Sequence, residues 1–277
     1  WPGIPSRNLD DPPALSWSPD SLSPFGTATM SCLIFGCRGI GRALAMRMSA
    51  RGVPVHLASR SEDHLKQLAS ELPNTTYTVC DVTKEGDIKR AYEEANDQAG
   101  AIQGLAYAVG SIVLKPYKSV TRKDLMQTFE LNAACAIEAA TTCAPTLKDS
   151  GGSIVLFSTV ACHVGLPNHT IIAAAKGAVE SATRSLAVDL APDVRVNCIA
   201  PSLTRSSLSA SMTKSEAMAN AIAAIHPLGR IGEPDDIASL AAFLLTNEDS
   251  GWITGQVIGV DGGRSTLSPA APAKAKK

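Results

Sequence analysis

The sequence is poor in aromatic residues and in net charge, and it has no long uncharged apolar run. Aromatic side chains make up 4% of the 277 residues, and the formal net charge is −1. A nearly neutral chain lacks the basic surface with which proteins bind nucleic acids or anionic membranes. No apolar stretch reaches the roughly 18 residues that a membrane-spanning helix needs. We therefore expect a small-molecule substrate as partner, with neither nucleic acid nor a membrane span.

Cysteine is present, but not in a pattern that builds a scaffold. The seven cysteines are an odd number and include no C-x-x-C pair. This spacing favours neither a disulfide framework nor a zinc site, so we expect no metal. Unpaired cysteines are typical of a reducing soluble compartment, either the cytoplasm or the interior of an organelle.

The two ends of the sequence differ from its centre. Residues 1–29 are rich in Pro, Ser and Asp, show no hydrophobic period and lack the apolar segment of a signal peptide. We interpret them as an extension without a core of its own, with a disordered tail as the favoured interpretation. The remnant of a targeting segment and an arm that contacts a neighbouring subunit or a larger complex are the alternatives. Residues 266–277 are expected to be a flexible basic tail.

Between these ends, residues 30–265 alternate between short apolar runs and helical patterns. Strands are expected at 33–36, 55–59, 77–80, 104–110, 153–158, 194–200 and 256–260. Helices are expected at 40–51, 61–71, 84–99, 121–148, 170–190, 213–224 and 234–246. This alternation predicts an α/β fold, a single-domain, doubly wound Rossmann fold with a seven-stranded parallel sheet and helices on both faces. The runs are continuously apolar, as in strands that are buried on both faces.

A glycine-rich turn lies between the first strand and the first helix. Glycines let a backbone turn sharply and approach a pyrophosphate, while the helix N-terminus supplies free N–H groups and partial positive charge. We therefore expect cofactor contacts from the whole turn, which comprises Gly36, Cys37, Arg38, Gly39, Ile40 and Gly41.

The end of the second strand predicts which nicotinamide cofactor is bound. A carboxylate at that place would bind the adenosine ribose and select NAD. The sequence has Ser59 there, followed by Arg60, and a further arginine, Arg38, in the glycine turn. Two guanidinium groups can pair with a 2′-phosphate, so we expect NADP(H).

The run FGCRGIGRALA resembles the glycine-rich turn of the short-chain dehydrogenase/reductase family, usually T-G-x-x-x-G-I-G. This copy is one residue shorter between its first two glycines, and Phe35 replaces the Thr. The resemblance extends over roughly residues 31–265 and is close in the C-terminal run from HPLGRIG to VDGG. It implies a homotetramer that is built through the helices at 121–148 and 170–190 and through the last strand.

The resemblance also implies further cofactor contacts. Asp81 and Val82 match the family's Asp-Val pair at the adenine amino group. Ala108, Val109 and Gly110 stand where the family has most of an Asn-Asn-Ala-Gly run. Near the nicotinamide, the family's Pro-Gly turn appears as Pro201, Ser202 and Leu203, with Thr204 or Ser206 within reach of the carboxamide.

In this family a tyrosine donates a proton to the substrate while a lysine four residues later lowers its pKa and binds ribose. Lys176 matches that lysine, and Asn132 matches the asparagine of the family's proton relay. Thr159, with Ser158 beside it, matches the serine that orients the substrate oxygen. Ile172 stands in the tyrosine's place and cannot donate a proton.

Three interpretations of this vacancy remain open. His169 lies seven residues before Lys176, where the related enoyl-acyl-carrier-protein reductases have a tyrosine, and histidine is a competent acid near neutral pH. Alternatively, water or the substrate completes protonation after hydride transfer. In the third interpretation the chain binds nucleotide but is catalytically inactive, serving as a structural or interaction subunit. The leading expectation is an NADP(H)-dependent oxidoreductase that reduces a carbonyl or an activated alkene.

The substrate side is less specific. Residues 205–225 are small and weakly amphipathic, which predicts a mobile flap over the substrate. His163, Leu166 and Pro167 are expected to form the opposite wall. Tyr117 is a further candidate pocket residue, although an ordinary loop aromatic is the favoured interpretation.

Overall fold

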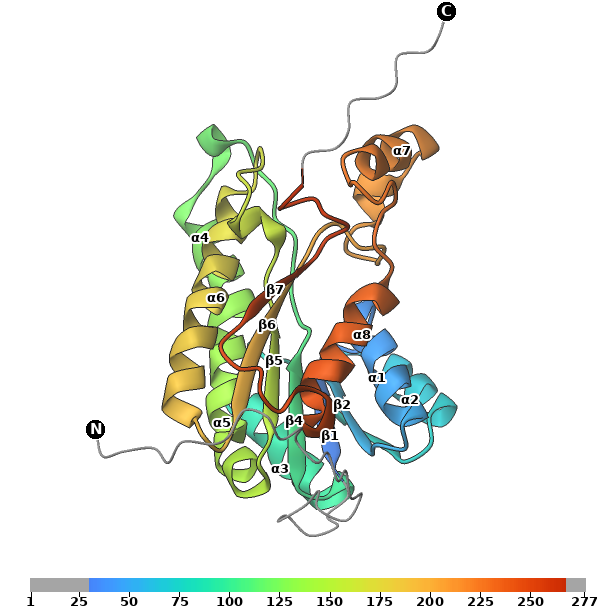
Figure 1. Cartoon of the computed structure of the whole chain (residues 1–277), viewed down its shortest axis with the longest axis vertical. Coiled ribbons are helices and arrows are strands. Elements are labelled where there is room, and N and C mark those ends of the chain that lie inside the picture. The colour runs from blue at the N-terminus through green and yellow to red at the C-terminus, as the bar shows by residue number, and fades with distance from the viewer. Residues whose placement is uncertain (1–29, 268–277) are drawn as a thin grey trace, which may run out of the picture.

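The computed structural model describes residues 30–267, which form one seven-stranded sheet covered by helices on both faces (Figure 1). The strand order is β3-β2-β1-β4-β5-β6-β7, and every neighbouring pair is parallel. The strands are β1 (Ser31–Phe35), β2 (Val55–Ser59), β3 (Thr75–Val79), β4 (Ile102–Tyr107), β5 (Ser153–Phe157), β6 (Arg195–Pro201) and β7 (Val257–Val260). The predicted fold class is therefore confirmed.

The burial of the strands explains why their sequences are apolar. All residues of β1, β5 and β6 are buried, because helices cover both faces of these central strands. The edge strands β3 and β7 are mostly half-buried instead. Two separate hydrophobic clusters, one on each face of the sheet, form the core of the fold.

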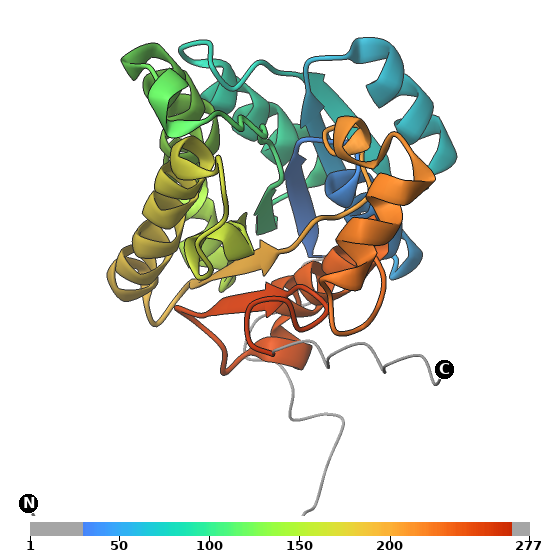
Figure 2. The same ribbon diagram turned by 90° about the horizontal axis from the view of Figure 1, so that it is seen from above.

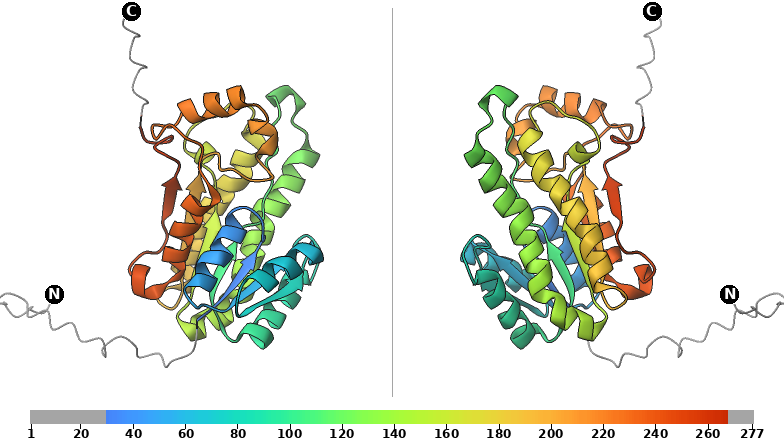
Figure 3. Two further views of the ribbon diagram at one scale, coloured as in Figure 1. Left: turned by 90° about the vertical axis from the view of Figure 1, so that its right-hand side faces the viewer. Right: turned by 90° about the vertical axis from the view of Figure 1, so that its left-hand side faces the viewer.

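Each face of the sheet carries three long helices (Figures 1 and 2). One layer consists of α1 (Ile40–Ala50), α2 (Glu62–Glu71) and α8 (Pro234–Leu245). The other consists of α3 (Asp87–Ala99), α5 (Cys135–Ser150) and α6 (Thr170–Leu190). In the right-hand view of Figure 3, α5 and α6 run side by side across this second layer.

The helical segment predicted over 121–148 is confirmed, and it contains a π-helical turn that the sequence did not indicate. The chain forms α4 (Arg122–Phe129), then a π-helical turn over Glu130–Ala134, then α5. Thr121 begins α4 with a capping box, since its hydroxyl accepts from the Asp124 N–H at 3.2 Å and the Asp124 carboxylate accepts from the Thr121 N–H at 3.1 Å. Single π turns inside helices are frequent at functional sites, and this one contains Asn132.

Short elements complete the described chain. They are the 3₁₀ turns Tyr117–Ser119, Val160–Cys162 and Ala210–Thr213, with helices α7 (Glu216–Ala224) and α9 (Asn247–Ser250). The predicted N-terminal extension and residues 268–277 of the predicted tail lie outside the described residues. Within residues 30–267, no helix is long and apolar enough to cross a membrane.

The strand order places a topological switch point between β1 and β4. The connections from β1 lead to β2 and β3 on one side, whereas β4 and the later strands extend on the other. In open parallel sheets, ligands bind outside the carboxyl ends of the strands at such a point. Helix α7 lies beyond this same end of the sheet in Figure 1.

Candidate active site

A cavity of about 420 Å³ lies at the carboxyl ends of the strands, and we call it the main cavity. Its walls come from the glycine turn, the ends of β4, β5 and β6, helix α6 and the segment around α7. Most of the lining side chains are apolar: Ile40, Ala108, Val109, Ile112, Phe157, Val160, Leu166, Pro167, Ile172, Pro201, Leu203, Leu208, Met212, Ile222 and Ile225. Apart from Gly110, the remaining lining residues are polar: Ser111, Asn132, Ser158, Thr159, His169, Lys176, Ser202, Thr204, Ser206, His226 and Arg264.

The glycine turn folds tightly at the switch point. Gly36 has φ +87°, and a Cβ at this position would lie 2.7 Å from the Ala108 carbonyl carbon of the neighbouring strand connection. A Cβ on Gly41 would lie 1.7 Å from the Gly36 carbonyl oxygen. Side chains at either position are incompatible with this backbone, so the turn presents bare backbone at the start of α1.

Two of the predicted cofactor residues point their side chains into the core. The Cys37 side chain is 1% exposed, and burial raises the pKa of its thiol to about 12. Val82 is 7% exposed and packs in the cluster beneath α3 and α5. These residues can offer a cofactor only backbone groups, and neither thiol chemistry nor a side-chain contact is available.

Arg38, Ser59 and Arg60 surround the ends of β1 and β2. Both arginines are exposed, and neither forms an ion pair with a carboxylate of residues 30–267. Asp81 follows β3 and accepts hydrogen bonds from the Thr83 hydroxyl at 2.8 Å and the Thr83 N–H at 3.2 Å. The Thr83 hydroxyl holds the pKa of the Asp81 carboxyl below its usual value, and the nearby positive charge of Arg60 lowers that pKa further.

Asn132 is fully buried in the π turn, and its amide is fixed at both ends. Its Oδ1 accepts from the Ser111 N–H at 3.1 Å, while its Nδ2 donates to the Ser111 hydroxyl at 2.9 Å and to the Thr128 carbonyl at 2.9 Å. A Cβ on Gly110 would lie 3.0 Å from Asn132 Oδ1 and 3.7 Å from Lys176 Nζ. Asn132, Gly110 and Lys176 therefore meet on one wall of the main cavity.

Lys176 projects from α6 into this wall. The residue is 7% exposed, and burial lowers the pKa of its ammonium to about 8. Its Nζ has no hydrogen-bond partner among residues 30–267, although the group lines the main cavity. A buried ammonium with unused donors is suited to bind hydroxyl groups of a ligand.

Thr159 and Ser158 follow β5 but serve different neighbours. The Ser158 hydroxyl donates to the buried Glu180 carboxylate of α6 at 2.6 Å, which fixes it against the helix. Thr159 Oγ1 accepts from the Ala161 N–H at 3.3 Å and can still donate its own proton. Both residues line the main cavity, and only Thr159 has a hydroxyl proton free for a ligand.

Ile172 and His169 lie near the start of α6 on the cavity wall. Ile172 is 5% exposed and adds only apolar surface where a proton donor was expected by family pattern. His169 Nδ1 lies 2.6 Å from the Pro167 carbonyl oxygen, which can only accept, so this nitrogen carries the hydrogen. The second ring nitrogen, Nε2, remains available to a ligand in the cavity.

The prediction that His163 lines the substrate wall is wrong. His163 does not line the main cavity, and its Nε2 pairs with the buried Glu180 carboxylate at 3.0 Å. Tyr117 is 76% exposed and also lies away from the cavity. Leu166 and Pro167 do line it, as expected.

The segment after β6 covers the glycine turn. A Cβ on Gly39 would lie 3.3 Å from Ser206 Cβ, so the start of the predicted flap sits directly over the phosphate turn. Thr204 Oγ1 donates to the Ser202 carbonyl at 3.1 Å. Further along, Leu208, Met212, Ile222 and Ile225 contribute apolar walls.

Sequence reasoning missed three polar residues of the cavity: Ser111, His226 and Arg264. Ser111 is the partner of Asn132, and its place one residue after Gly110 was the available signal. His226 belongs to the run HPLGRIG, whose match to the family pattern carries no signal for a pocket residue. Arg264 follows the last glycines of the chain, where nothing local indicates a pocket.

Comparison with known proteins identifies the family. The family model described as enoyl-(acyl carrier protein) reductase matches residues 35–265. A tropinone reductase homolog of Arabidopsis thaliana is 35% identical over 235 residues, covering 82% of this chain and 89% of that protein. The structure of a short-chain type dehydrogenase/reductase from Mycobacterium ulcerans is 30% identical, with a TM-score of 0.81 over 87% of this chain and 91% of that one.

The chain belongs to the short-chain dehydrogenase/reductase family. This is a family of oxidoreductases that bind nicotinamide cofactors. A further similar structure is a gluconate 5-dehydrogenase from Burkholderia cenocepacia in complex with NADP and tartrate, 26% identical with a TM-score of 0.80. That match covers 86% of this chain and 96% of the dehydrogenase.

Proposed function

We propose that this member of the short-chain dehydrogenase/reductase family is an NADP(H)-dependent reductase of a small apolar carbonyl compound or activated alkene. The observation that carries the proposal is the meeting of Lys176 Nζ, Asn132 and Gly110 on one wall of the main cavity. A buried ammonium beside a fixed amide, in a cavity of about 420 Å³ with apolar walls, suits hydride transfer to a desolvated acceptor.

The choice of NADP(H) rests on charge at the ends of β1 and β2. Exposed guanidinium groups of Arg38 and Arg60 have no carboxylate partner among residues 30–267, and Ser59 adds a hydroxyl. A 2′-phosphate can pair with both arginines, whereas a ribose hydroxyl gains little from them. The bare backbone of Gly36–Gly41, with the start of α1, would hold the pyrophosphate.

The residues of the main cavity divide the remaining work. When bound, NADPH supplies the hydride. Lys176 binds the nicotinamide ribose and keeps positive charge near the reacting oxygen, while Asn132 fixes Ser111 and the connection after β4. Thr159 donates a hydrogen bond to the substrate oxygen, where negative charge develops. Pro201 and Leu203 close the far side of the nicotinamide, and Asp81 and Val82 lie toward the adenine.

The proton comes from a group other than tyrosine, and His169 is its proposed source. Its Nδ1 is fixed by the Pro167 carbonyl, so Nε2 is the atom that can carry a proton to the cavity. General acids of this kind contribute about 10²–10⁴-fold to a rate. The proton leaves Nε2 for the substrate oxygen, and solvent restores it.

Cofactor titration tests the first half of the proposal. We expect NADPH to bind the wild type more tightly than NADH, and Arg60→Asp to reverse this order by removing one guanidinium and adding a repelling carboxylate. Lys89→Asp, which changes charge equally at a 71%-exposed side chain on α3, is the matched control. Tighter binding of NADH by the wild type would contradict the proposed specificity.

A stopped-flow panel of carbonyl compounds and enoyl thioesters tests the second half. His169→Ala is expected to lower the rate of NADPH oxidation at least about tenfold. His163→Gln is the control, because it keeps a donor for Glu180 and lies outside the main cavity. An unchanged rate in His169→Ala would remove His169 from the mechanism and favour proton delivery by water.

One observation favours a second candidate function. The 5%-exposed side chain of Ile172 gives the site an apolar contact at the position of the family's acid. A catalytically inactive, nucleotide-binding subunit with a structural or interaction role would have this feature. Tight NADPH binding without oxidation by any compound of the panel would select this alternative.

We further propose a homotetramer in a reducing compartment. All seven cysteines are free thiols, six of them buried, which supports a reducing environment. The contact of residues 1–29 with a neighbouring subunit stays a prediction, because these residues lie outside the described part of the chain. Thiol titration of the unfolded, purified protein should return seven reactive groups per chain without reductant.

A further inference from the structure

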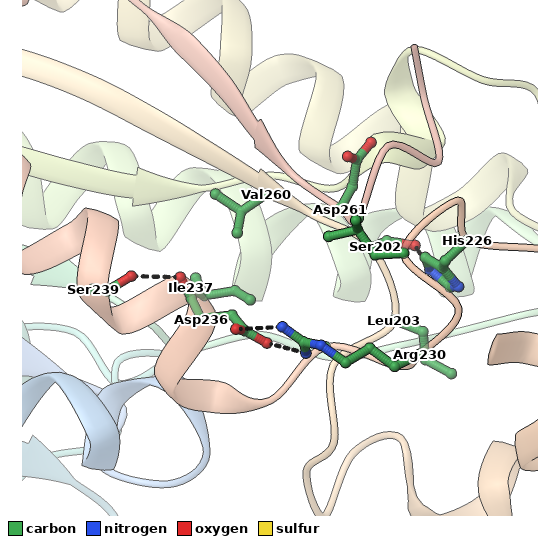
Figure 4. Close-up of a pocket in the computed structure, with 12 residues that line it drawn as sticks. Ser202, Leu203, His226, Arg230, Asp236, Ile237, Ser239, Val260 and Asp261 are labelled. Carbon is green, nitrogen blue, oxygen red and sulfur yellow. Dashed lines mark hydrogen bonds and ion pairs between the residues drawn. The ribbon is translucent and has the colours of Figure 1, made fainter. Parts of the chain in front are cut away.

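A serine and a histidine form a hydrogen-bonded pair between two cavities. Ser202 Oγ lies 2.7 Å from His226 Nε2 (Figure 4). Both residues line the main cavity and also a second cavity of about 190 Å³, which we call the side cavity. The proposed reduction uses neither side chain, so the pair needs a separate account.

The contacts of His226 fix which atom donates. His226 Nδ1 lies 2.8 Å from the Ile222 carbonyl oxygen, which can only accept, so Nδ1 carries the ring hydrogen. In the neutral ring Nε2 is then an acceptor, and the Ser202 hydroxyl donates to it. His226 is 3% exposed, and this burial keeps the ring from rotating into solvent. A serine that donates to a base held by a third group is the arrangement of an activated nucleophile.

The backbone beside Ser202 offers a stabilising donor. The Ser202 N–H donates to the Val260 carbonyl at 3.4 Å, but the next amide, that of Leu203, has no acceptor within residues 30–267. Leu203 lines both cavities. In serine hydrolases the N–H of the residue after the nucleophile helps to bind the oxyanion of the tetrahedral intermediate. The Leu203 amide is the corresponding N–H in this chain, and it is not used by another acceptor of residues 30–267.

The two cavities differ in the chemistry of their linings, and the Ser202–His226 pair lies between them. The main cavity is mostly apolar and accommodates an acyl chain. The side cavity is bounded by the bidentate ion pair of Arg230 with Asp236, at 2.6 and 2.8 Å (Figure 4). Its volume suits a group of a few heavy atoms, and polar lining residues such as Arg230, Ser239 and Asp261 suit a hydroxyl group. A bond lying across the Ser202–His226 pair would have its acyl part on one side and its alcohol on the other.

From this geometry we propose that Ser202 and His226 give the protein a second activity, the hydrolysis of small apolar esters. Ser202 Oγ attacks the acyl carbon, its proton passes to His226 Nε2, and the Leu203 N–H binds the oxyanion. The ester C–O bond then breaks, and the departing alcohol takes the proton from Nε2. Water attacks the acyl-serine with His226 as base, which releases the carboxylic acid and restores the hydroxyl.

Covalent labelling of the full chain, without nicotinamide cofactor, tests the proposal. A fluorophosphonate probe is expected to form one adduct on the wild type, located on Ser202 by peptide mass spectrometry. His226→Gln should slow this labelling at least about tenfold, because the base is lost. Hydrolysis of p-nitrophenyl butyrate should fall in parallel and vanish in Ser202→Ala.

Ser239→Ala is the matched control. Ser239 also lines the side cavity, but its hydroxyl donates to the Asp236 carbonyl at 2.8 Å and has no histidine partner. Labelling of this variant should equal that of the wild type. Absence of an adduct on wild-type Ser202, or equal labelling of His226→Gln and wild type, would overturn the proposal. Because no cofactor is present, these results are independent of the proposed reduction.

Discussion

At the scale of single residues, the site combines buried polar side chains with one apolar side chain, Ile172, that cannot donate a proton. Lys176 and Asn132 are buried with their polar atoms directed at the main cavity, whereas Ile172 contributes an apolar wall among them. The oxygen of a reduced substrate would therefore meet Thr159 and Lys176 as donors. The proposed proton donor is His169, which has a free ring nitrogen on the cavity wall, and water is the alternative.

Introducing a tyrosine at position 172 tests directly whether the absence of the family's acid limits the rate. In a His169→Ala background, Ile172→Tyr is expected to raise the rate of NADPH-dependent reduction at least about tenfold, because a phenol near Lys176 supplies the missing acid. Ile172→Phe in the same background provides the ring without the hydroxyl and should give no gain. Equal rates for the Tyr and Phe variants would contradict this prediction, because they would show that proton transfer does not limit the rate.

The lowered pKa of Lys176 predicts a pH dependence for cofactor binding. Burial brings the pKa of this ammonium to about 8, so the group is charged at pH 7 and neutral at pH 9.5. The affinity for NADPH should therefore fall as pH rises through about 8, measured by fluorescence titration from pH 6 to 9.5. Lys176→Arg keeps its charge over this range and should show no fall near pH 8. A fall of equal size in that variant would assign the titration to another group.

At the scale of elements, the glycine turn and α1 act as one unit. The Gly36 carbonyl occupies the space that a side chain on Gly41 would need, and Gly36 lies against the connection after β4. These close contacts fix the backbone conformation of the turn, so its amides can bind a ligand without reorganisation. Such a turn depends on contacts between residues five positions apart and on a neighbouring strand.

Gly41→Ala is expected to disrupt this unit. Its Cβ would lie 1.7 Å from the Gly36 carbonyl oxygen, so the turn must shift, at a cost of about 1–3 kcal/mol in unfolding free energy. NADPH affinity should fall at least about tenfold, because the amides lose their positions. Gly165→Ala is the control, since a Cβ there meets nothing within 4 Å and φ is not positive. Unchanged affinity in Gly41→Ala would place the pyrophosphate elsewhere.

The helices and strands also show how much of the fold could be predicted from the sequence. Each predicted strand exists within a few residues of its expected range. Strands of a parallel sheet are buried on both faces, so their sequences are continuous apolar runs that can be recognised directly. The π turn inside the helix expected over 121–148 could not be predicted from the sequence. The π turn at Glu130–Ala134 fits Asn132 against Ser111, a contact between segments about twenty residues apart that no local period reveals.

At the scale of the whole molecule, several apolar side chains remain uncovered on the layer that contains α6. On α4, Met126 and Phe129 are 57% and 42% exposed, and on α6 Val188 is 77% exposed. Trp252, just before β7, is fully exposed. These positions fall on the helices and beside the strand through which the tetramer is predicted to form, and their apolar surface favours association.

The predicted tetramer has a measurable mass. Light scattering should return four times the chain mass of 28.8 kDa, and Phe129→Arg should lower the mass by placing a charge in an apolar interface. Met46→Arg is the control, because Met46 is similarly exposed at 42% but lies on α1, in the opposite layer. A wild-type mass equal to one chain would contradict the tetramer.

The sequence by itself determined the fold class, the family, the glycine turn and the positions of Lys176, Asn132 and Thr159, because these depend on local periodicity and on short spacings along the chain. It also predicted that Ile172 stands where the family has its tyrosine, so that the usual acid is absent. Only the tertiary structure decided which side chains share the main cavity, that His163 pairs with Glu180 instead of lining it, and that Ser202 donates to His226. Those facts depend on how segments distant in sequence pack together, and hydrogen-bond partners across such distances leave no periodic trace in the chain.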